Sequence, residues 1–364
     1  MPFDLSPEYL VGMTLWLAAG GACFYLLLRQ RQKWRLRNSP KLVWANAGLA
    51  LWMFLAALTA LELYFAVVYD QSDSFNMTNV SKHWFERHVR KNPQGYRDDK
   101  PLKKRVPEGA RRVLFAGDSF TFGHGIKDVA DRFSDRVGAR LEAEKPGKFV
   151  VSNVGECGLH VQLVAHMVET AVDLGYQVEV VVYTICLNDI EGFKESETGM
   201  QERFDSQSPR FPLFRDTYFL NMLYFRVQQA RLPEVRNYYA NMAEFYKTSA
   251  WDRMRAELEK FHEYCRGHEI DLRIAIFPFL HNLGPDYPFD AGHERIAEFC
   301  RSAGVPCLDL KPVLLPHIAE GLTVNRFDAH PNERAHALAA EAMERQLLGD
   351  LFRGERERGK RIED

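Results

Sequence analysis

Short apolar runs that alternate with amphipathic helical patterns constrain the fold of this chain more than any other feature. Such runs are typical of strands, and those rich in β-branched residues are typical of strands buried on both faces. We expect five strands, at residues Arg112–Ala116, Phe149–Val154, Val178–Ile185, Leu272–Phe277 and Val305–Leu310. Repeated strand–helix units predict a parallel sheet with helices on both faces. The expected fold class is therefore α/β, a three-layer αβα sandwich with a five-stranded, mostly parallel sheet.

Helical spacing fills the intervals between these runs. Apolar residues recur every three or four positions in each interval, as the buried face of a helix requires. The intervals are marked by Val129, Phe133, Val137 and Leu141, by Val161, Val164, Val168, Ala171 and Val172, and finally by Ala335, Leu338, Ala339 and Ala342. We expect Gly349 to end the last helix, because glycine is favoured just past a helix C-terminus.

Polar motifs stand where these strands end. Gly117-Asp118-Ser119 follows the first run, Gly155 the second and Asn188-Asp189 the third, while Asp328-Ala329-His330 opens the last helical pattern. The carboxyl ends of parallel strands share one edge of a sheet, where open α/β folds build their sites. A lone Gly-Asp-Ser would arise by chance about one time in ten in a chain of this length. The ordered set is what indicates a site.

This order resembles the SGNH (GDSL-type) hydrolase family. Residues 117–125, Gly-Asp-Ser-Phe-Thr-Phe-Gly-His-Gly, and residues 92–98, Asn-Pro-Gln-Gly-Tyr-Arg-Asp, are similar to blocks of its bacterial membrane-linked members. The resemblance covers residues 80–348 approximately. It implies a serine esterase with Ser119 as nucleophile, His330 as general base and Asp328 as the acid that orients the base.

The resemblance also implies an oxyanion hole and supporting residues. The expected donors are the backbone N–H groups of Ser119 and Gly155 and the side-chain amide of Asn188. Losing one such donor typically costs about 2.7–4 kcal/mol of transition-state stabilisation. Glycine suits position 155 because a side chain would obstruct the substrate carbonyl. We expect Asp118 and Asp189 to anchor their loops through hydrogen bonds to the backbone.

One spacing departs from the commonest family pattern. Many members carry Asp-x-x-His, whereas a single residue separates Asp328 from His330, and Phe327 occupies the usual acid position. The shorter spacing occurs among relatives that continue Pro-Asn, as this chain does. Asp328 is therefore retained. His124, His160 and His166 lack an acid partner in a motif, which favours surface or supporting roles.

Composition narrows the class of ligand. The 364 residues carry a formal net charge of −2 and 46% hydrophobic residues, which is a globular composition without the basic excess that nucleic-acid binding requires. No cysteine or histidine spacing resembles a metal site. We expect no cofactor, no metal and no nucleic-acid partner.

Two apolar stretches near the N-terminus are long enough to cross a bilayer. Residues Tyr9–Leu28 carry no charge, and Leu42–Val68 are interrupted only by Asn46 and Glu62. A cleavable signal peptide fits the first stretch poorly, because its start is acidic and no small-residue cleavage site precedes the basic loop. We expect two transmembrane helices, and we expect Glu62 to be paired or to reach the interface rather than to serve a function.

The charge around these stretches predicts an orientation. The intervening loop, residues 29–41, holds six basic residues and no acid, and the outer flanks carry acids with no basic residue nearby. The positive-inside bias places this loop in the cytoplasm. Everything after residue 69 then faces the periplasm or exterior of a bacterial inner membrane. The predicted organisation comprises residues 1–8 outside, helices 9–28 and 42–69, a linker 70–110 that docks on the domain, a catalytic domain 111–350 and a charged tail 351–364.

An aromatic insertion, residues 190–250, leaves the domain from the Asn188 end of its strand. Insertions of this length are usually functional or separately structured. Residues 218–231 and 234–247 have helical patterns. A helical pair packed on the domain, a lid or glycan-contacting wall, and contact with the bilayer all remain open.

Five cysteines would lie in an oxidising compartment if this orientation holds. An odd number leaves at least one thiol unpaired. Cys157 with Cys186, and Cys300 with Cys307, are conceivable pairs, and buried free thiols are the alternative. The five are Cys157, Cys186, Cys265, Cys300 and Cys307.

These observations predict a membrane-anchored, extracytoplasmic serine esterase that removes O-acyl groups, O-acetyl above all, from cell-surface polysaccharide. Its partners would be an acylated glycan or small ester, the membrane, and a membrane-bound acyltransferase. One alternative is an O-acetyltransferase that uses the same triad. Others are an inactive glycan-binding or scaffold protein and an esterase for long-chain lipid esters.

Overall fold

The computed structural model describes residues 5–194, 208–231 and 237–352. The charged tail from residue 353, the first four residues and parts of the aromatic insertion lie outside the described residues. Internal contacts divide the chain into two compact units, one with the N-terminal helices and one with the sheet. Residues 72–74 belong to the sheet unit although they follow the helices in sequence.

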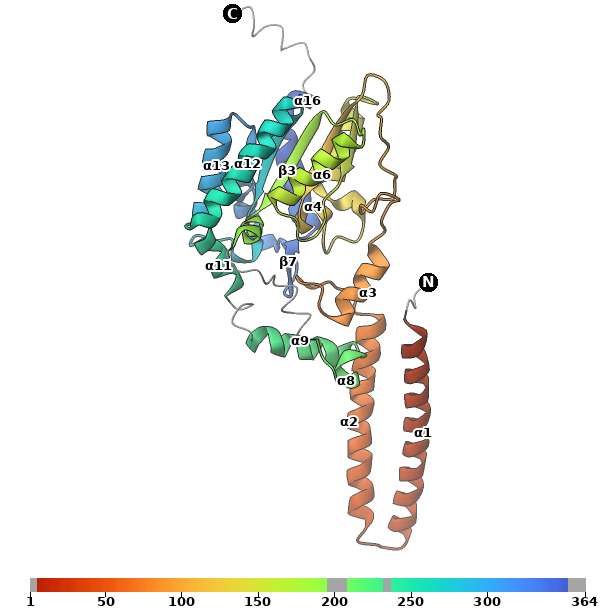
Figure 1. Cartoon of the computed structure of the whole chain (residues 1–364). Coiled ribbons are helices and arrows are strands. Elements are labelled where there is room, and N and C mark those ends of the chain that lie inside the picture. Colours follow the sequence, from red (N-terminus) through yellow and green to blue (C-terminus); the bar gives the residue numbers. More distant parts are fainter. Residues whose placement is uncertain (1–4, 195–207, 232–236, 353–364) are drawn as a thin grey trace, which may run out of the picture. The chain divides into compact units, whose positions relative to one another are not determined.

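The sheet unit is built on five parallel strands (Figure 1). Their order is β2-β1-β3-β4-β5, and every neighbouring pair is parallel. The expected α/β fold with a five-stranded parallel sheet is therefore confirmed. The strands are β1 (Arg111–Gly117), β2 (Phe149–Asn153), β3 (Val180–Cys186), β4 (Asp271–Phe277) and β5 (Cys307–Asp309).

The central strand β3 is buried at every residue, which explains its continuous apolar sequence. Its neighbour β1 is buried at six of seven positions, with Arg111 half-buried at the outer end. Because β1, β3 and β4 are in parallel register, their last residues lie at one edge. Gly117 pairs with Thr184, and Cys186 pairs with Phe277. Residues that directly follow these strands are therefore neighbours in space.

Helices cover both faces of this sheet. Helices α6 and α12 pack on each other over one face, and α5 and α15 pack on each other over the opposite face (Figure 1). The helices are α4 (Ser119–Phe122), α5 (Phe133–Glu144), α6 (Val161–Asp173), α11 (Tyr238–Phe245), α12 (Ser249–Gly267), α13 (Asp290–Ala303), α14 (Lys311–Leu314) and α15 (Glu333–Ala342). Short 3-10 turns are η1 (Val129–Asp131), η2 (Leu187–Phe193), η3 (Leu280–Asn282) and η4 (Leu315–Glu320).

The end of the domain corrects one expectation. Gly349 does not end the last helix. Instead α15 passes into a π-helical turn, η5 (Met343–Leu347), whose C-cap is Leu348, and Gly349 begins a further short helix, α16 (Gly349–Phe352). A buried apolar residue, Leu351, holds this extra turn against the unit, and such packing overrides the preference of glycine for a helix end.

The other unit contains the two apolar helices, α1 (Pro7–Leu36) and α2 (Leu42–Val67). Each is long and apolar enough to cross a membrane, with a mean hydropathy of 1.8 in its most apolar window. They pack along each other through Phe24 and Trp52, whose rings stack at 4.3 Å. The Trp52 indole N–H donates to the carbonyl of Gly20 at 2.9 Å. This polar contact fixes how the two helices face each other.

Glu62 of α2 caps another helix of the same unit. Its carboxylate accepts the backbone N–H groups of Tyr218 and Phe219, each at 2.8 Å, at the start of α9 (Phe219–Arg231). The hydroxyl of Tyr9 donates to it at 2.9 Å. An acid at a helix N-terminus satisfies unpaired N–H groups. Glu62 is therefore paired, as the sequence led us to expect.

The aromatic insertion divides between the units. Its first helices, α8 (Pro212–Arg215) and α9, lie in the unit of the apolar helices, where α9 contacts α2. Its last helix, α11, lies in the sheet unit and contacts η2. A simple helical pair packed on the catalytic domain is therefore wrong. Helix formation near residues 218–231 and 238–245 is as expected.

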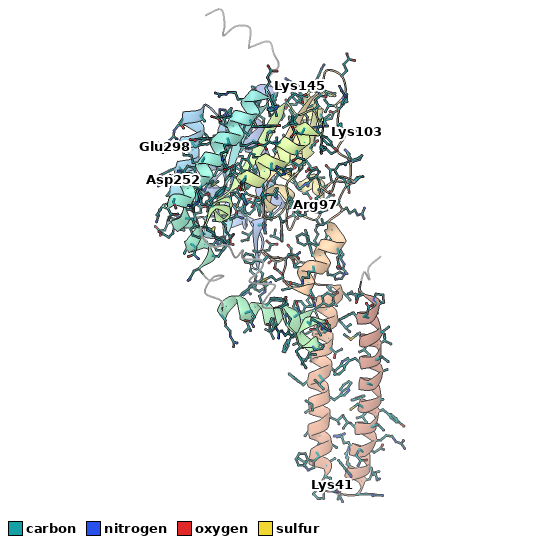
Figure 2. All side chains as sticks on the ribbon, in the orientation of Figure 1. Lys41, Arg97, Lys103, Lys145, Asp252 and Glu298 are labelled. Carbon is teal, nitrogen blue, oxygen red and sulfur yellow. The ribbon has the colours of Figure 1, made fainter. Side chains whose placement is uncertain are left out.

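The stretch expected to be a linker, residues 70–110, has structure of its own. It contains α3 (Asn79–His88) and an isolated bridge between Lys91 and Arg97. The Arg97 side chain, labelled in Figure 2, is buried, and its guanidinium donates to the carbonyls of Gly123 and Ile126. This arginine fixes the loop after α4.

Candidate active site

Ser119 lies at the turn between β1 and α4. Asp118 is the N-cap of α4, and its carboxylate accepts the Phe120 N–H at 2.9 Å. Glycine is required at position 117, because a Cβ there would lie 2.6 Å from the carbonyl oxygen of Thr184 on β3. The tight turn places the Ser119 hydroxyl at the carboxyl edge of the sheet, as expected from the Gly-Asp-Ser sequence.

The structure brings His330 and Asp328 to this hydroxyl. His330 Nε2 lies 2.9 Å from Ser119 Oγ, and its Nδ1 lies 2.6 Å from Asp328 Oδ1. Both residues belong to β7 (Asp328–Pro331), which pairs antiparallel with β6 (Thr323–Asn325). In an extended strand, residues two apart point to the same side. The short Asp-x-His spacing works for this reason.

Asp328 is a fully buried carboxylate in a polar setting. Burial by itself raises the pKa of the Asp328 carboxyl. The charge of a protonated His330 ring, the nearby His124 and the hydrogen bonds from His330 and Ser72 outweigh burial and hold this pKa well below its usual range. The group is therefore ionised at neutral pH and suited to stabilising an imidazolium.

The expected oxyanion donors differ in how free they are. The Gly155 N–H already donates to Asn153 Oδ1 at 2.8 Å, so a substrate oxygen would have to share it. A Cβ at position 155 would also lie 2.6 Å from the backbone nitrogen of Phe122, so glycine is needed for packing as well as for access. The Asn188 side chain hydrogen-bonds to Asp118, while its Oδ1 has no partner among the described residues.

Asp118 and Asp189 are buried beside this site. The largest influence on each is burial, which raises the pKa of both carboxyls. For Asp189 the nearby charge of Asp118 adds to the increase in pKa, and its carboxylate accepts a hydrogen bond from the hydroxyl of Tyr183. Asp118 meets the expectation of a loop anchor, whereas Asp189 is held by a tyrosine side chain.

Two residues near the triad were not singled out from the sequence as part of it. The hydroxyl of Ser72 donates to Asp328 Oδ2. The ring of His124 stacks on that of His330 with centroids 4.0 Å apart and planes at 9°. Ser72 carries no motif signal and comes from a segment remote in sequence, whereas His124 lies in the 117–125 block but has no acid partner in its own loop.

A metal ion has little room in this cluster. Ligand atoms of His124, Asp328 and His330 lie within 4.8 Å of one another. However, His330 Nδ1 and Asp328 Oδ1 approach to 2.6 Å and bond directly, which leaves no space for an ion between them. The donors are thus engaged with one another and with Ser119.

All six cysteines lie in the described part of the chain and are free thiols. Cys157 Sγ lies 3.9 Å from His124 Nδ1, and a side-chain hydrogen bond joins Cys300 to Cys307. Cys186, Cys265 and Cys300 match the alternative of buried free thiols, whereas Cys157 and Cys307 are exposed.

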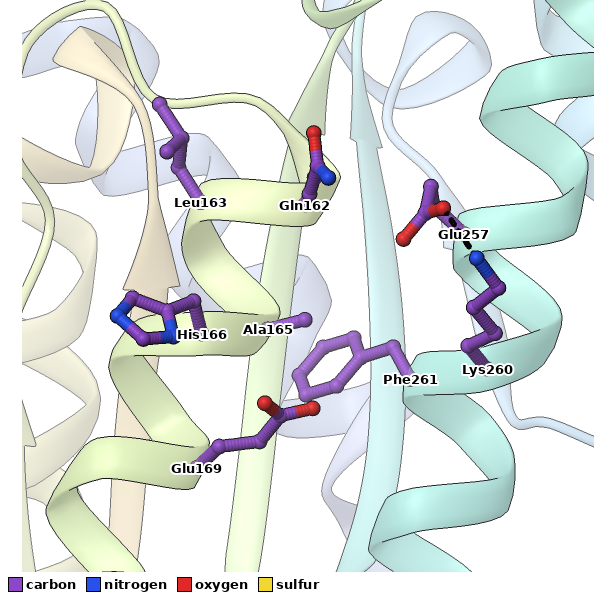
Figure 3. Close-up of a pocket in the computed structure, with 8 residues that line it drawn as sticks. All are labelled: Gln162, Leu163, Ala165, His166, Glu169, Glu257, Lys260 and Phe261. Atoms are coloured by element: carbon purple, nitrogen blue, oxygen red, sulfur yellow. Dashed lines mark hydrogen bonds and ion pairs between the residues drawn. The ribbon is translucent and has the colours of Figure 1, made fainter.

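A groove between α6 and α12 is separate from this cluster (Figure 3). It is lined by helical side chains that include His166 and an ion pair between Glu257 and Lys260. None of its lining residues belongs to the Ser119 cluster. His166 therefore lies on a helix surface, in keeping with the sequence interpretation.

Comparison with known proteins agrees with this geometry. The family model described as GDSL-like lipase/acylhydrolase matches residues 115–338, well over half of the chain. The match begins in β1 and ends in α15, so it spans Ser119, Asp328 and His330. No curated protein matches the chain.

Solved structures similar to this chain include a member of the lipolytic G-D-S-L family from Veillonella parvula, at 15% identity and a TM-score of 0.41, covering 65% of this chain and 97% of that one. An acetylxylan esterase from Geobacillus stearothermophilus, solved as a catalytic mutant, has 13% identity and a TM-score of 0.42, covering 68% and 98%. A two-domain esterase active on acetylated mannans has 14% identity and a TM-score of 0.40, covering 67% and 50%. The family assignment rests on the family model: this chain belongs to the GDSL-like lipase/acylhydrolase family and is an ester-hydrolysing enzyme.

Proposed function

We propose that this chain is a membrane-anchored serine esterase that removes O-acyl groups, O-acetyl above all, from cell-surface polysaccharide through an acyl-serine intermediate. The observation that carries the proposal is the connected set Ser119, His330 and Asp328, with 2.9 Å from hydroxyl to imidazole and 2.6 Å from imidazole to carboxylate. A hydroxyl within hydrogen-bond reach of a base that is itself oriented by an acid is the arrangement of an activated nucleophile.

The geometry supports the following sequence of steps. Ser119 Oγ forms a bond to the acyl carbon while His330 Nε2 takes the hydroxyl proton. The tetrahedral intermediate then expels the sugar alkoxide, which receives that proton from His330. Water, deprotonated by the same imidazole, attacks the acyl-serine. The second tetrahedral intermediate expels Ser119 Oγ, which receives the proton from His330, and the acid is released. Asp328 keeps the Nδ1 proton in place and stabilises the imidazolium in both halves.

The developing oxyanion needs preorganised donors at this edge. We assign this role to the N–H of Ser119 at the start of α4, to the Asn188 amide and to the Gly155 N–H, which Asn153 shares. Donors held by the fold act without reorganisation, and each typically contributes about 2.7–4 kcal/mol. The bond from Asn188 to Asp118 supports this assignment, because it holds the amide next to the nucleophile's turn.

An aromatic cluster beside β7 supports a carbohydrate substrate. The Tyr239 ring lies 3.8 Å from the His281 ring and 5.0 Å from that of Phe279. The turn η3, which holds His281, contacts β7, which holds His330. Aromatic faces pack well against the apolar face of a sugar ring. The resemblance to membrane-linked family members favours the same class of substrate.

The two apolar helices support membrane anchoring, and the basic loop at residues 29–41 supports a cytoplasmic position for that loop. The catalytic unit would then face the periplasm or exterior of a bacterial inner membrane. In this proposal a membrane-bound acyltransferase would supply the O-acylated glycan.

The direct test is Ser119→Ala in the full chain, solubilised in detergent. We expect ester cleavage to fall by at least about 10⁴-fold, because without the Ser119 hydroxyl no acyl-serine forms and water would have to attack the ester directly. Hydrolysis of a small acetyl ester and covalent labelling by a fluorophosphonate probe both report the loss. The matched control is Ser152→Ala, since Ser152 and Ser119 are both 8% exposed but Ser152 lies on β2 outside the cluster.

Full activity in Ser119→Ala, or labelling at another residue, would contradict the proposal. Product analysis with an acetyl donor and an oligosaccharide present distinguishes the O-acetyltransferase alternative. Release of acetate supports the esterase, whereas net acetylation of the oligosaccharide supports the transferase. Preference for long-chain esters would instead indicate a lipid substrate.

A further inference from the structure

The segment Ser72–Ser74 follows the second apolar helix by a few residues of sequence and is part of the catalytic unit. It runs beside the loop that carries the catalytic acid. The backbone N–H of Ser74 donates to the carbonyl of Phe327 at 3.1 Å, and the Ala329 N–H donates to Ser74 Oγ at 2.9 Å. Asn325 Nδ2 donates to the carbonyl of Ser72 at 3.1 Å. These bonds hold the segment in register with residues on both sides of the acid.

This register places a hydroxyl on the far oxygen of the catalytic acid. Oδ1 of Asp328 accepts from His330 Nδ1 at 2.6 Å and from the His330 backbone N–H at 3.1 Å. Oδ2 accepts from the Ser72 hydroxyl, and Ser72 is only 3% exposed. A buried carboxylate pays a large desolvation cost unless its lone pairs are used. In the described structure Ser72 is the closest partner of the oxygen that His330 does not use.

His124 completes this arrangement. Its Nε2 lies 2.9 Å from the carbonyl oxygen of Asp73 and 3.5 Å from Asp328 Oδ2. Both neighbours are acceptors, so Nε2 carries the proton. Burial and the nearby His330 lower the pKa of His124 to about 3, so the ring is neutral. A neutral ring can stack on His330 without adding a second positive charge.

We propose that Ser72, together with His124, is a positioning residue of the catalytic centre: the Ser72 hydroxyl donates to the second oxygen of Asp328, while the His124 ring binds the Asp73 carbonyl and stacks on His330, and together they fix the plane in which Asp328 holds His330. The inference rests on the proposed serine-esterase function. It adds that residues directly following the second apolar helix are part of the machinery. The other titratable groups that influence the cluster are Arg97 from the stretch after α3, Asp118 at the start of α4, Cys157 after β2, Tyr239 on α11 and His336 on α15.

The test compares Ser72→Ala with Ser72→Thr in the full chain. Loss of a hydrogen bond to a charged group costs enough to lower kcat by about 10- to 100-fold. KM should stay unchanged, because Ser72 is buried and bonds the Asp328 oxygen that His330 does not use. The acidic limb of the pH–rate profile should move to higher pH, because a carboxylate without its hydroxyl donor holds the imidazolium proton more tightly. Ser72→Thr keeps the hydroxyl and should restore most of the activity and the original profile.

Ser74→Ala is the matched control. It removes a hydroxyl that holds the same loop through backbone groups but does not touch the carboxylate. We expect its pH profile to stay where it is in the parent. A shift of the same size in Ser74→Ala would show that the loop, and not the donor on Oδ2, matters, and would overturn the proposal.

A second variant keeps the proposal testable if Ser72→Ala does not fold. His124→Phe retains a ring on His330 but lacks the N–H, and it should lower kcat with the same direction of pH shift. Ser119→Ala distinguishes a failure of the positioning role from a failure of the proposed esterase function. If it abolishes activity while Ser72→Ala and His124→Phe match the parent, only the positioning role fails. If Ser119→Ala stays active, the proposed function itself fails.

Discussion

Two buried aspartates at the same edge of the sheet have opposite electrostatic surroundings. Asp328 is 0% exposed and Asp189 is 1% exposed. Yet the pKa of Asp328 is held well below its usual range, whereas that of Asp189 lies well above it. Burial raises both values and is the largest single influence on each, so burial cannot explain the difference.

The groups that neighbour each aspartate explain the difference in pKa. Asp328 faces two imidazoles and a hydroxyl, all of which stabilise its negative charge. Asp189 faces the carboxyl of Asp118, and only the Tyr183 hydroxyl opposes the increase in pKa. The difference shows that the surroundings of Asp328 favour its charged form, whereas those of Asp189 disfavour it. Burial alone would not identify a catalytic acid in this chain.

Asp328→Asn should give the largest effect on activity. An amide preserves the shape of the side chain but cannot stabilise the imidazolium. If its N–H donates to His330 Nδ1, the ring proton moves to Nε2, which can then no longer accept the Ser119 proton. We therefore expect kcat to fall by about 10⁴-fold. Asp189→Asn should change kcat by less than about tenfold, because Asp189 bonds the Tyr183 hydroxyl and not the Ser119 cluster, and its burial disfavours the charge that the amide removes. Initial rates on an acetyl ester measure both. Equal losses in the two variants would remove the distinction between the two sites.

At pH 7 only one of these two substitutions, Asp328→Asn, should lower thermal stability. The lowered pKa of Asp328 stabilises the fold above about pH 4, and this contribution is lost as pH falls through the folded-state value. The raised pKa of Asp189 does the reverse, since its favourable contribution exists below about pH 4 and is lost as pH rises. Asp328→Asn should therefore lower the free energy of unfolding by about 1–3 kcal/mol, and Asp189→Asn should leave it equal or higher. Melting temperatures of the detergent-solubilised chain show whether each variant is more or less stable than the parent. A large decrease for Asp189→Asn would indicate that the charge of Asp189 stabilises the fold.

Much of the sheet could be predicted from the sequence because its signal is local. The run Val178–Ile185 is so continuously apolar that only a buried strand fits it, and β3 occupies residues 180–186. The end of the last helix was mispredicted for the complementary reason. The contact that holds α16 is tertiary, and the preference of Gly349 to end a helix does not reveal it.

The residues of the active site also differ in how far the sequence predicts them. Ser119, Asp328 and His330 follow strand ends or precede a helix, so parallel topology predicts that they meet. Ser72 could not be predicted to join them, because its role depends on a register between two segments more than 250 residues apart. The insertion likewise gave helical patterns but no indication that α9 would be capped by Glu62.

A third buried group extends the comparison to a histidine outside the site. His336 on α15 is fully buried, and burial together with the charges of Arg132 and Arg136 lowers its pKa to about 3. Below pH ~6.5 the unfolded chain takes up a proton at this position, which the folded chain does not accept until about pH 3. Stability should therefore fall on acidification by up to about 1.4 kcal/mol per pH unit from this residue alone.

His336→Asn tests this smallest effect. His336 Nδ1 accepts the Phe133 N–H at 3.1 Å, and the asparagine Oδ1 can accept the same bond without titrating. The variant should lose a constant amount of stability, because asparagine does not fill the space of the buried ring, but its melting temperature should fall less between pH 7 and pH 5 than that of the parent. The slope should not vanish, because His124, with a pKa lowered to about 3, still titrates in the unfolded chain. An unchanged slope would mean that His336 takes up its proton in the folded state. Burial and the nearby arginines would then not keep this ring neutral.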